Sequence, residues 1–314
     1  MKGDVTSLVF LVIIQIISFT CTLYILFEFG KKRSQIRSLP NHLIAGLLLI
    51  SAWSTTFDLP VTQFYFWTNA VPIKTPEACR FYNFALFSIC GLNRMFMAFL
   101  SIERHFLVFH AQIYRTTRTR WLYHFVPLII IILWIVIYSL VTDIIITCPQ
   151  LHFRYSYFLC NYTCSILVPE LLLFYVYFQV FFPTVVTIVA GVLLPIRFVM
   201  QKRSMQRFQW RQTRKLTIQT GLICAVYTIS WAPYAIFLQL LSNDRVSLSD
   251  ESISRFLIFG PYVTPLLTPF ICFYTTPTPI KMFLSQQINR YCFRRHQNIV
   301  HPHNVTLNQL PANQ

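Results

Sequence analysis

Long apolar stretches alternate with short polar segments along this chain, on the length scale of a lipid bilayer. Seven such stretches occur, at roughly residues 5–29, 43–67, 81–109, 121–146, 172–200, 216–241 and 256–274. Each is long enough for the helix of about 20 residues that crosses a hydrocarbon layer. Lipid offers no hydrogen-bond partners to the backbone, so such segments are satisfied only as helices. The pattern predicts an all-α membrane protein, a bundle of seven transmembrane helices.

The basic residues indicate how this bundle is oriented. A net charge of +16 is compatible with nucleic-acid binding, but most of the 26 Lys and Arg residues fall in every second gap. These residues cluster at 31–37, 104–120, 197–215 and 281–295. Positive residues are enriched in cytoplasmic segments. We therefore expect an extracellular amino terminus, a cytoplasmic carboxyl terminus, the lipid bilayer as surroundings and no nucleic-acid partner.

Two sequons fall on opposite sides of the membrane in this topology. Asn161 begins the sequon Asn-Tyr-Thr in the longest expected outer loop, where it would be glycosylated. Asn304 begins a second sequon in the expected inner tail, where it would stay unmodified. Four cysteines are expected on the outer, oxidising side, where disulfides form: Cys79, Cys148, Cys160 and Cys164.

The chain is expected to divide into a helical domain at residues 1–275 and two short segments. Pro277 and Pro279 precede apolar and basic residues that predict a short amphipathic helix on the inner membrane face, within 276–295. Cys292 in this segment would carry a palmitoyl group or remain a free thiol. Residues 296–314 are polar and are expected to be a disordered cytoplasmic tail.

An acid and a base stand together at the inner end of the third stretch, in the sequence Glu103-Arg104-His105. Charges are tolerated near the membrane interface, so an ordinary interfacial ion pair is one interpretation. Cys79 lies about 25 residues before Arg104, roughly 37 Å along a helix. One helix would thus present a thiol at the outer face and an arginine at the inner face.

This spacing belongs to an ordered set of positions: Trp134 in the fourth stretch, Pro183 in the fifth, Ser230-Trp231-Ala232-Pro233 in the sixth and Thr268-Pro269 in the seventh. The set resembles the rhodopsin-like (class A) G-protein-coupled receptors over nearly the whole chain, as a divergent, orphan member. The resemblance implies a receptor in the plasma membrane, an extracellular ligand bound among the helices, and a heterotrimeric G protein as the intracellular partner.

The family's activation motifs correspond to particular residues here. Glu103-Arg104-His105 matches the D-R-Y motif, whose arginine contacts the G protein in the active state. Trp231-Ala232-Pro233 matches C-W-x-P, with Ser230 in place of the cysteine and Tyr227 in place of a preceding phenylalanine. Proline removes a helical hydrogen bond and kinks a helix. The expected kinks, which would let a helix swing about its bend, are at Pro183, Pro233 and Pro269.

Some positions depart from the family's pattern. Ser51, Thr268 and Cys272 stand where an aspartate, an asparagine and a tyrosine are usual, which would dismantle the sodium site and the tyrosine switch. No acid occurs between Glu170 and Asp244, so the sixth helix offers Arg104 no ionic partner, and Glu103 is the nearest acid. We expect a loosened resting state with appreciable signalling in the absence of ligand.

The resemblance also implies a ligand pocket in the outer half of the bundle, lined by Leu86, Phe87, Cys90, Trp231, Tyr234 and Tyr262. Leu86 stands where amine receptors carry an aspartate, and Tyr262 where opsins carry the retinal-binding lysine, so monoamines and retinal are disfavoured. An apolar, aromatic lining would suit a peptide or a small hydrophobic chemosensory compound. The resemblance further implies a disulfide from Cys79 to the outer loop, at Cys160 or alternatively at Cys164, with Cys148 pairing with the remaining cysteine.

Arg94 lies in the middle of the third stretch, where an ionisable group is costly and marks a candidate functional site. A buried ion pair with Asp58 is the favoured interpretation, and recognition of an anionic ligand is the alternative. Asp58 and Glu170 are the acids considered for the outer half of the bundle.

Other protein classes fit less well. The sequence has no Gly-rich phosphate loop and no His-Glu-x-x-His motif, so neither an enzyme nor a metal site or cofactor is expected. No inverted repeat is evident, which argues against a transporter. A non-signalling decoy or scaffold receptor stays open because the polar motifs are altered.

Overall fold

The computed structural model describes residues 5–31, 39–146, 153–157, 160, 163–200, 207–242 and 251–275. The chain divides into two compact units, Met1–Thr275 and Thr276–Gln314. The second unit, with the expected amphipathic helix, Cys292 and the tail, lies outside the described residues, as do Cys148 and Asn161.

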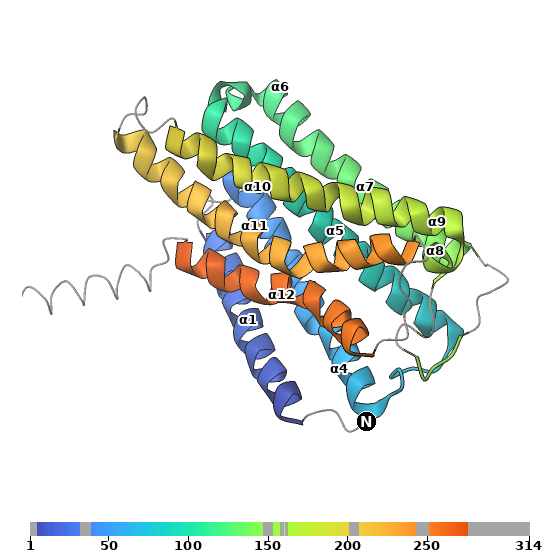
Figure 1. The fold of residues 1–314 in the computed structure, drawn as a ribbon. Coiled ribbons are helices and arrows are strands. Elements are labelled where there is room, and N and C mark those ends of the chain that lie inside the picture. The colour runs from blue at the N-terminus through green and yellow to red at the C-terminus, as the bar shows by residue number, and fades with distance from the viewer. Residues whose placement is uncertain are drawn as a thin grey trace, which may run out of the picture. The chain divides into compact units, whose positions relative to one another are not determined.

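Every regular element in the described part of the chain is helical (Figure 1). The first stretch is α1 (Val5–Lys31); the second joins α3 (Leu39–Trp53), the π-helical turn η1 (Ser54–Asp58) and α4 (Leu59–Thr68); the third is α5 (Pro76–Phe109). The fourth joins α6 (Thr117–Arg120), η3 (Trp121–Phe125), α7 (Val126–Ser139) and η4 (Leu140–Ile145). The fifth joins α9 (Pro169–Phe174), η6 (Tyr175–Phe181) and α10 (Phe182–Met200); the sixth is α11 (Arg207–Ser242) and the seventh α12 (Glu251–Thr275). Two short helices lie in the connections, η2 (Ala111–Tyr114) and α8 (Cys164–Leu167).

The surface of the bundle is that of a multi-pass membrane protein. In the described residues, six helical stretches are long and apolar enough to cross a bilayer: Leu8–Lys31, Asn41–Thr68, Pro76–Phe109, Thr117–Ile145, Pro169–Met200 and Arg214–Leu240. Large apolar side chains point outward from these helices, among them Phe10, Phe27, Ile130, Val199 and Ile229. A soluble protein rarely exposes apolar surface on this scale, whereas lipid accommodates it.

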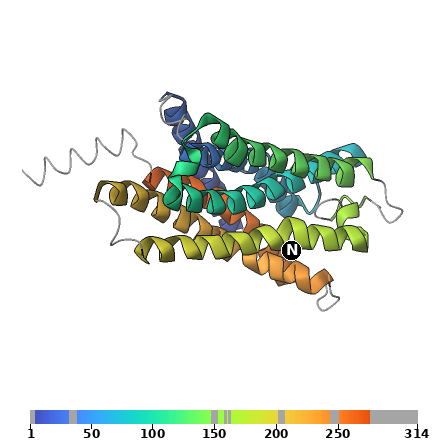
Figure 2. The same ribbon diagram turned by 90° about the horizontal axis from the view of Figure 1, so that it is seen from above.

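The helices lie side by side in one bundle (Figures 1 and 2), and the contacts between them form a closed ring. In chain order α1 packs on α3, α3 on α5, α10 on α11 and α11 on α12, and α12 returns to α1. The ring closes between α5 and α10, because α7 packs on the outer side of α5. Of these six spans, that of α5 is the most enclosed: 61% of its most apolar 18 residues are buried, against 17% in the span of α1. Residues on α5 therefore reach most of the other helices.

Local sequence signals fix where these helices begin and bend. Thr75 caps α5 by accepting a hydrogen bond from the Ala78 amide at 3.3 Å, and Pro76 follows at the first helical position. Asn69 ends α4 in the left-handed conformation, with φ of 52°. Near the end of the bundle that carries Arg104, called the inner end here because the charge pattern predicts that it faces the cytoplasm, α10 and α11 approach closely at Gly191. A Cβ added at Gly191 would lie 2.9 Å from the Cys224 Cβ. Small residues commonly permit such approaches between membrane helices.

Candidate functional site

The acid of the Glu103-Arg104-His105 motif is paired with a residue that the sequence did not single out. Glu103 on α5 and His124 on η3 are both buried, and the His124 Nδ1 donates a short hydrogen bond to the Glu103 Oε1. The His124 Nε2 in turn lies 3.1 Å from the Nδ1 of His42 on α3. In the described part of the chain, this is the contact between an acidic and a basic side chain at ion-pair distance, and it is an ion pair when His124 is protonated. Glu103, which the sequence identified as the acid nearest to Arg104, therefore also has a buried partner on another helix, His124.

The chain His42–His124–Glu103 is satisfied in two protonation states. When His124 is neutral with its proton on Nδ1, its Nε2 accepts from His42. When His124 is protonated, both of its nitrogens donate and His42 accepts. Tyr114, in the loop after α5, interacts electrostatically with the same carboxylate. Burial, and then the charge of Glu103, raise the pKa of Tyr114 to about 12. These contacts join α3, α5 and η3 at the inner end of the bundle.

Arg104 is buried beside two cysteines of the last two helices. Its guanidinium interacts electrostatically with Glu103 on α5, and then with Cys272 on α12 and Cys224 on α11. Ser101, one turn earlier on α5, lies 3.2 Å from the Cys224 Sγ, and the Gln219 Nε2 donates to the Cys272 Sγ at 3.7 Å. Cys272, which by the resemblance stands in place of the tyrosine of the switch, therefore lies within electrostatic reach of Arg104.

The hydroxyls that replace the sodium-site residues are bonded within their own helices. Ser51 donates to the Leu47 carbonyl at 2.8 Å, and Thr268 donates to the Thr264 carbonyl at 2.7 Å. His105, by contrast, bridges to α10 through the Ala190 carbonyl at 2.8 Å.

Trp231 lies at the centre of the bundle on α11, two residues before Pro233, which lies inside this helix. Only 1% of its surface is exposed. Its ring is stacked with Tyr227 at 6.0 Å between centroids and makes an edge contact with Tyr234 at 5.5 Å. Ser230 beside it lies 2.7 Å from the Thr264 hydroxyl of α12. This contact connects α11 to α12.

Arg94 does not pair with Asp58, so the favoured interpretation from the sequence is wrong. Its Nε donates to the Gln179 carbonyl at 2.6 Å, and its Nη2 donates to the Tyr175 hydroxyl at 3.5 Å. The guanidinium carbon lies 4.8 Å from the centre of the Trp231 ring and 5.6 Å from that of Tyr175. Arg94 thus joins α5, η6 and α11 through one hydrogen-bonded carbonyl and two aromatic faces.

The carbonyl that Arg94 reaches is available for a reason written in the sequence. Pro183 has no N–H to donate to the carbonyl of Gln179, four residues earlier. The turn before this proline is π-helical, from Tyr175 to Phe181. A buried carbonyl without its helical donor needs another one, and the guanidinium of Arg94 supplies it.

Asp58 is buried on η1 in the outer half of the bundle, and neither of its carboxylate oxygens has a hydrogen bond of ordinary geometry. Thr62, one turn later, lies 2.8 Å from the Tyr262 hydroxyl and 3.2 Å from that of Tyr82. Glu170, the other acid considered for this region, is exposed on α9.

The six expected pocket residues fall into three neighbouring hydrophobic clusters. Leu86, Phe87 and Tyr234 pack with Tyr175 and Val180. Cys90 and Trp231 belong to the central cluster, and Tyr262 packs with Leu59 and Leu266 near α1.

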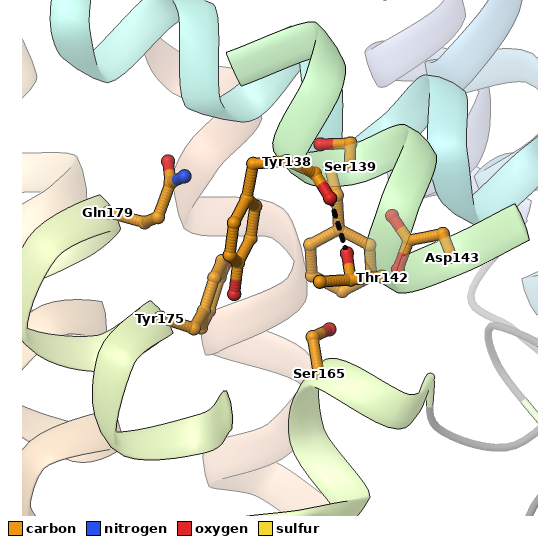
Figure 3. A pocket seen from close by; sticks show the side chains of 8 residues that line it. Tyr138, Ser139, Thr142, Asp143, Ser165, Tyr175 and Gln179 are labelled. Atoms are coloured by element: carbon orange, nitrogen blue, oxygen red, sulfur yellow. Dashed lines mark hydrogen bonds between the residues drawn. The ribbon is translucent and has the colours of Figure 1, made fainter. Parts of the chain in front are cut away.

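Phe87 is the one member of this set that lines the narrow pocket shown in Figure 3. The pocket lies between α5, the fourth and fifth helical stretches and α8. Its other lining residues are polar or aromatic: Tyr138, Ser139, Thr142, Asp143, Ser165, Tyr175 and Gln179. Sequence reasoning missed Asp143, although it is the one Asp, Glu, Lys or Arg residue among 121–146 and for that reason could have been found.

The outer loop is tied to the start of α5. Cys79 and Cys160 form a disulfide with a Cα–Cα distance of 5.9 Å, which decides between the two pairings that the sequence left open. Cys164, at the start of α8, is also disulfide-bonded. Cys148, its expected partner, lies outside the described residues.

Comparison with known proteins gives one match. The family model described as 7 transmembrane receptor (rhodopsin family) matches residues 7–272. This range includes Glu103, Arg104 and His124 as well as Arg94 and Trp231. No individual curated protein matches the chain.

Proposed function

Because the chain belongs to the rhodopsin family of seven-transmembrane receptors, we propose that it binds an extracellular ligand within its helix bundle and activates a heterotrimeric G protein. In this proposal α12 is the seventh span, the protein resides in the plasma membrane, and the amino terminus is outside. The inner end of the bundle then carries Arg104 and the basic residues, and the outer end carries the Cys79–Cys160 disulfide.

The contact of Arg94 with Trp231 supports this function most directly. Arg94 touches the outer part of the fifth helical stretch through Gln179 and Tyr175, and it touches α11 beside Pro233. A ligand that displaces η6 would therefore alter the packing of the Trp231 ring. Pro233 lacks the N–H that would bond to the Ile229 carbonyl, so we propose that α11 bends there and that a small rotation at Trp231 becomes a larger displacement of the inner end of the helix.

Movement of α11 would change the surroundings of Arg104. In this proposal the arginine is held in the resting state by its electrostatic interactions with Glu103, with Cys272 on α12 and with Cys224 on α11, while Glu103 is also held by His124. A ligand shifts the population towards the displaced form only by binding it more tightly. Displacement of α11 would remove Cys224 from Arg104 and leave the guanidinium accessible to a G protein.

The test is ligand-free second-messenger output in transfected cells, compared between the wild type and Arg104→Ala at matched surface expression. We expect the wild type to signal above the variant, because α11 (Arg207–Ser242) carries no acidic residue that could hold Arg104 in the resting state through an ion pair to this helix. Arg118→Ala, which removes an exposed cytoplasmic charge, is the matched control and should signal like the wild type. Equal output from the wild type and Arg104→Ala would contradict ligand-free signalling.

Orientation is tested separately by epitope accessibility. An amino-terminal epitope should be stained on intact cells, whereas a carboxyl-terminal epitope should require permeabilisation. The reverse result would contradict the receptor function, since Arg104 would then face the outside.

A non-signalling decoy or scaffold receptor is the second candidate, and a specific observation favours it. The hydroxyls of Ser51 and Thr268 bond only to carbonyls of their own helices, and Cys272 replaces the tyrosine, so the polar network by which relatives transmit activation has different contacts here. Screening a ligand library against several chimeric G proteins separates the two. A ligand that binds at the surface yet activates none of the G proteins would favour the decoy.

A further inference from the structure

The pocket between the fourth and fifth helical stretches contains polar atoms that have no hydrogen bond of ordinary geometry within the described part of the chain. Both carboxylate oxygens of Asp143, the Tyr138 hydroxyl and the Gln179 side-chain nitrogen are buried without a hydrogen bond. The Thr142 hydroxyl beside Asp143 donates instead to the Tyr138 carbonyl at 3.0 Å (Figure 3). The Ser165 hydroxyl lies 2.6 Å from that of Thr163.

An unpaired carboxylate in this position is expensive. Only 6% of the surface of Asp143 is exposed, and taking a carboxylate out of water without a partner is strongly unfavourable. Buried polar groups in proteins are nearly all satisfied, so a group that is not requires an explanation. Arg94, which bonds to the pocket residue Gln179, is committed to the Gln179 carbonyl and to the Trp231 and Tyr175 rings.

The backbone is irregular on two of the pocket's walls, those formed by the fourth and fifth helical stretches. Asp143 lies on the π-helical turn η4 (Leu140–Ile145), and Tyr175 and Gln179 lie on the π-helical turn η6 (Tyr175–Phe181). Such turns are rare and occur frequently at functional sites. The third wall is α8, whose first residue, Cys164, is fixed by a disulfide.

We propose that this pocket binds the ammonium group of a small organic amine, with Asp143 as its counterion. The carboxylate oxygens accept hydrogen bonds from the ammonium group, and the unpaired Gln179 nitrogen and Tyr138 hydroxyl donate to an acceptor elsewhere on the ligand. The inference rests on the proposed receptor function, for which it names a ligand class. The counterion is on the fourth helical stretch, so it differs from the amine-receptor position that Leu86 occupies here.

The pocket is closed in this structure, because the passages among its lining side chains are too narrow for a water molecule. Only an amine of a few heavy atoms would fit, and side chains must move to admit it. Tyr138, which is only half-buried, and Ser165 on the short helix α8 are the side chains that would move to admit the ligand. Phe87 and Tyr175 supply an apolar wall for its hydrocarbon part.

The test is the apparent Tm of the purified full-length receptor, titrated at neutral pH with n-butylamine, with uncharged n-butanol and with anionic butyrate. We expect a saturable rise in Tm with butylamine alone. Asp143→Asn should weaken this effect roughly thirtyfold or more, because it removes one partner of a buried charge pair. The matched control is Asp58→Asn, which neutralises an equally buried and unpaired carboxylate outside the pocket and should leave the butylamine titration unchanged.

Three results would overturn the proposal. These are a butylamine effect of equal size in Asp143→Asn, stabilisation by butyrate instead of butylamine, and a wild type that responds to none of the three compounds while Asp143→Asn raises its Tm. The last would identify Asp143 as a protonated structural group. Should Asp143→Asn fail to fold, Ser165→Leu decides, because it fills the pocket and should weaken butylamine binding with Asp143 intact. Ligand-free signalling through Arg104 is measured independently, so failure here and failure of the receptor function are distinguishable.

Discussion

The contacts of Arg94 give a prediction that separates the tertiary structure from the ion pair that the sequence favoured. In the structure Arg94 contacts the Gln179 carbonyl and the Trp231 ring, and it does not pair with Asp58. A double-mutant cycle measures which residue Arg94 is coupled to. The variants are Arg94→Met, Trp231→Leu and Asp58→Asn, singly and in the two pairs that contain Arg94→Met.

The single substitution is not diagnostic, because two large effects oppose each other. Losing a charge-assisted hydrogen bond costs about 1.5–3 kcal/mol, and losing a desolvated cation–π contact costs about 2 kcal/mol. Removing a buried guanidinium recovers its desolvation energy, which is several kcal/mol for a buried ion. The coupling energy is free of this cancellation, because the desolvation is common to both arms of the cycle.

We expect a coupling of about 1–2 kcal/mol between Arg94 and Trp231, from the ring contact at 4.8 Å. Between Arg94 and Asp58 we expect less than about 0.5 kcal/mol, as for residues that share no contact. For a protein of this size 1 kcal/mol shifts Tm by roughly 2–4 °C, so the two couplings are resolvable.

The assay is the apparent Tm of the purified receptor without ligand, at one fixed scan rate because unfolding of such proteins is often irreversible. A thiol-reactive fluorophore reports unfolding, since the free cysteines Cys224 and Cys272 are buried in the folded protein. A coupling above 1 kcal/mol between Arg94 and Asp58, together with none between Arg94 and Trp231, would refute the reasoning and restore the ion pair.

Three further predictions concern the Glu103–His124 pair and the outer loop. His124→Phe leaves the Glu103 carboxylate buried without its partner and should destabilise the receptor by about 3–5 kcal/mol, measured as a lower Tm; adding Glu103→Gln should recover part of this loss, and no recovery would show that the pair is not the cause. The disulfide closes a loop with a sequence separation of 81, so Cys79→Ser should cost about 4 kcal/mol of stability, and Cys160→Ser should cost nothing more in that background; additive losses would contradict the Cys79–Cys160 pairing. Asn161→Gln should remove a glycosidase-sensitive mass shift from the protein in cells, and a shift that survives would contradict the proposed topology.

The inner motif shows where sequence reasoning stopped short. The charge pattern and the sequence Glu103-Arg104-His105 predicted an activation site at the inner end of the third helix, and the structure buries Glu103 and Arg104 there. The partner of Glu103 was not predictable, because His124 comes from a different helix and looks like an ordinary residue in an apolar stretch. Its role depends on how the fourth helical stretch is rotated about its axis, which a uniformly hydrophobic sequence does not specify.

The sequence by itself determined the helices and their membrane setting. The lengths of the apolar stretches fix this, because backbone groups in lipid must bond within their own helix. The position of Pro183 likewise determined that the Gln179 carbonyl would lack its helical donor.

Only the tertiary structure decided which buried charges meet. It assigned Arg94 to Gln179 and Trp231, and it left Asp143 unpaired in a pocket. The physical reason is that a side chain in the bundle chooses among partners from several helices. The choice depends on helix rotation and on distances of a few ångströms, and hydropathy along one chain contains neither.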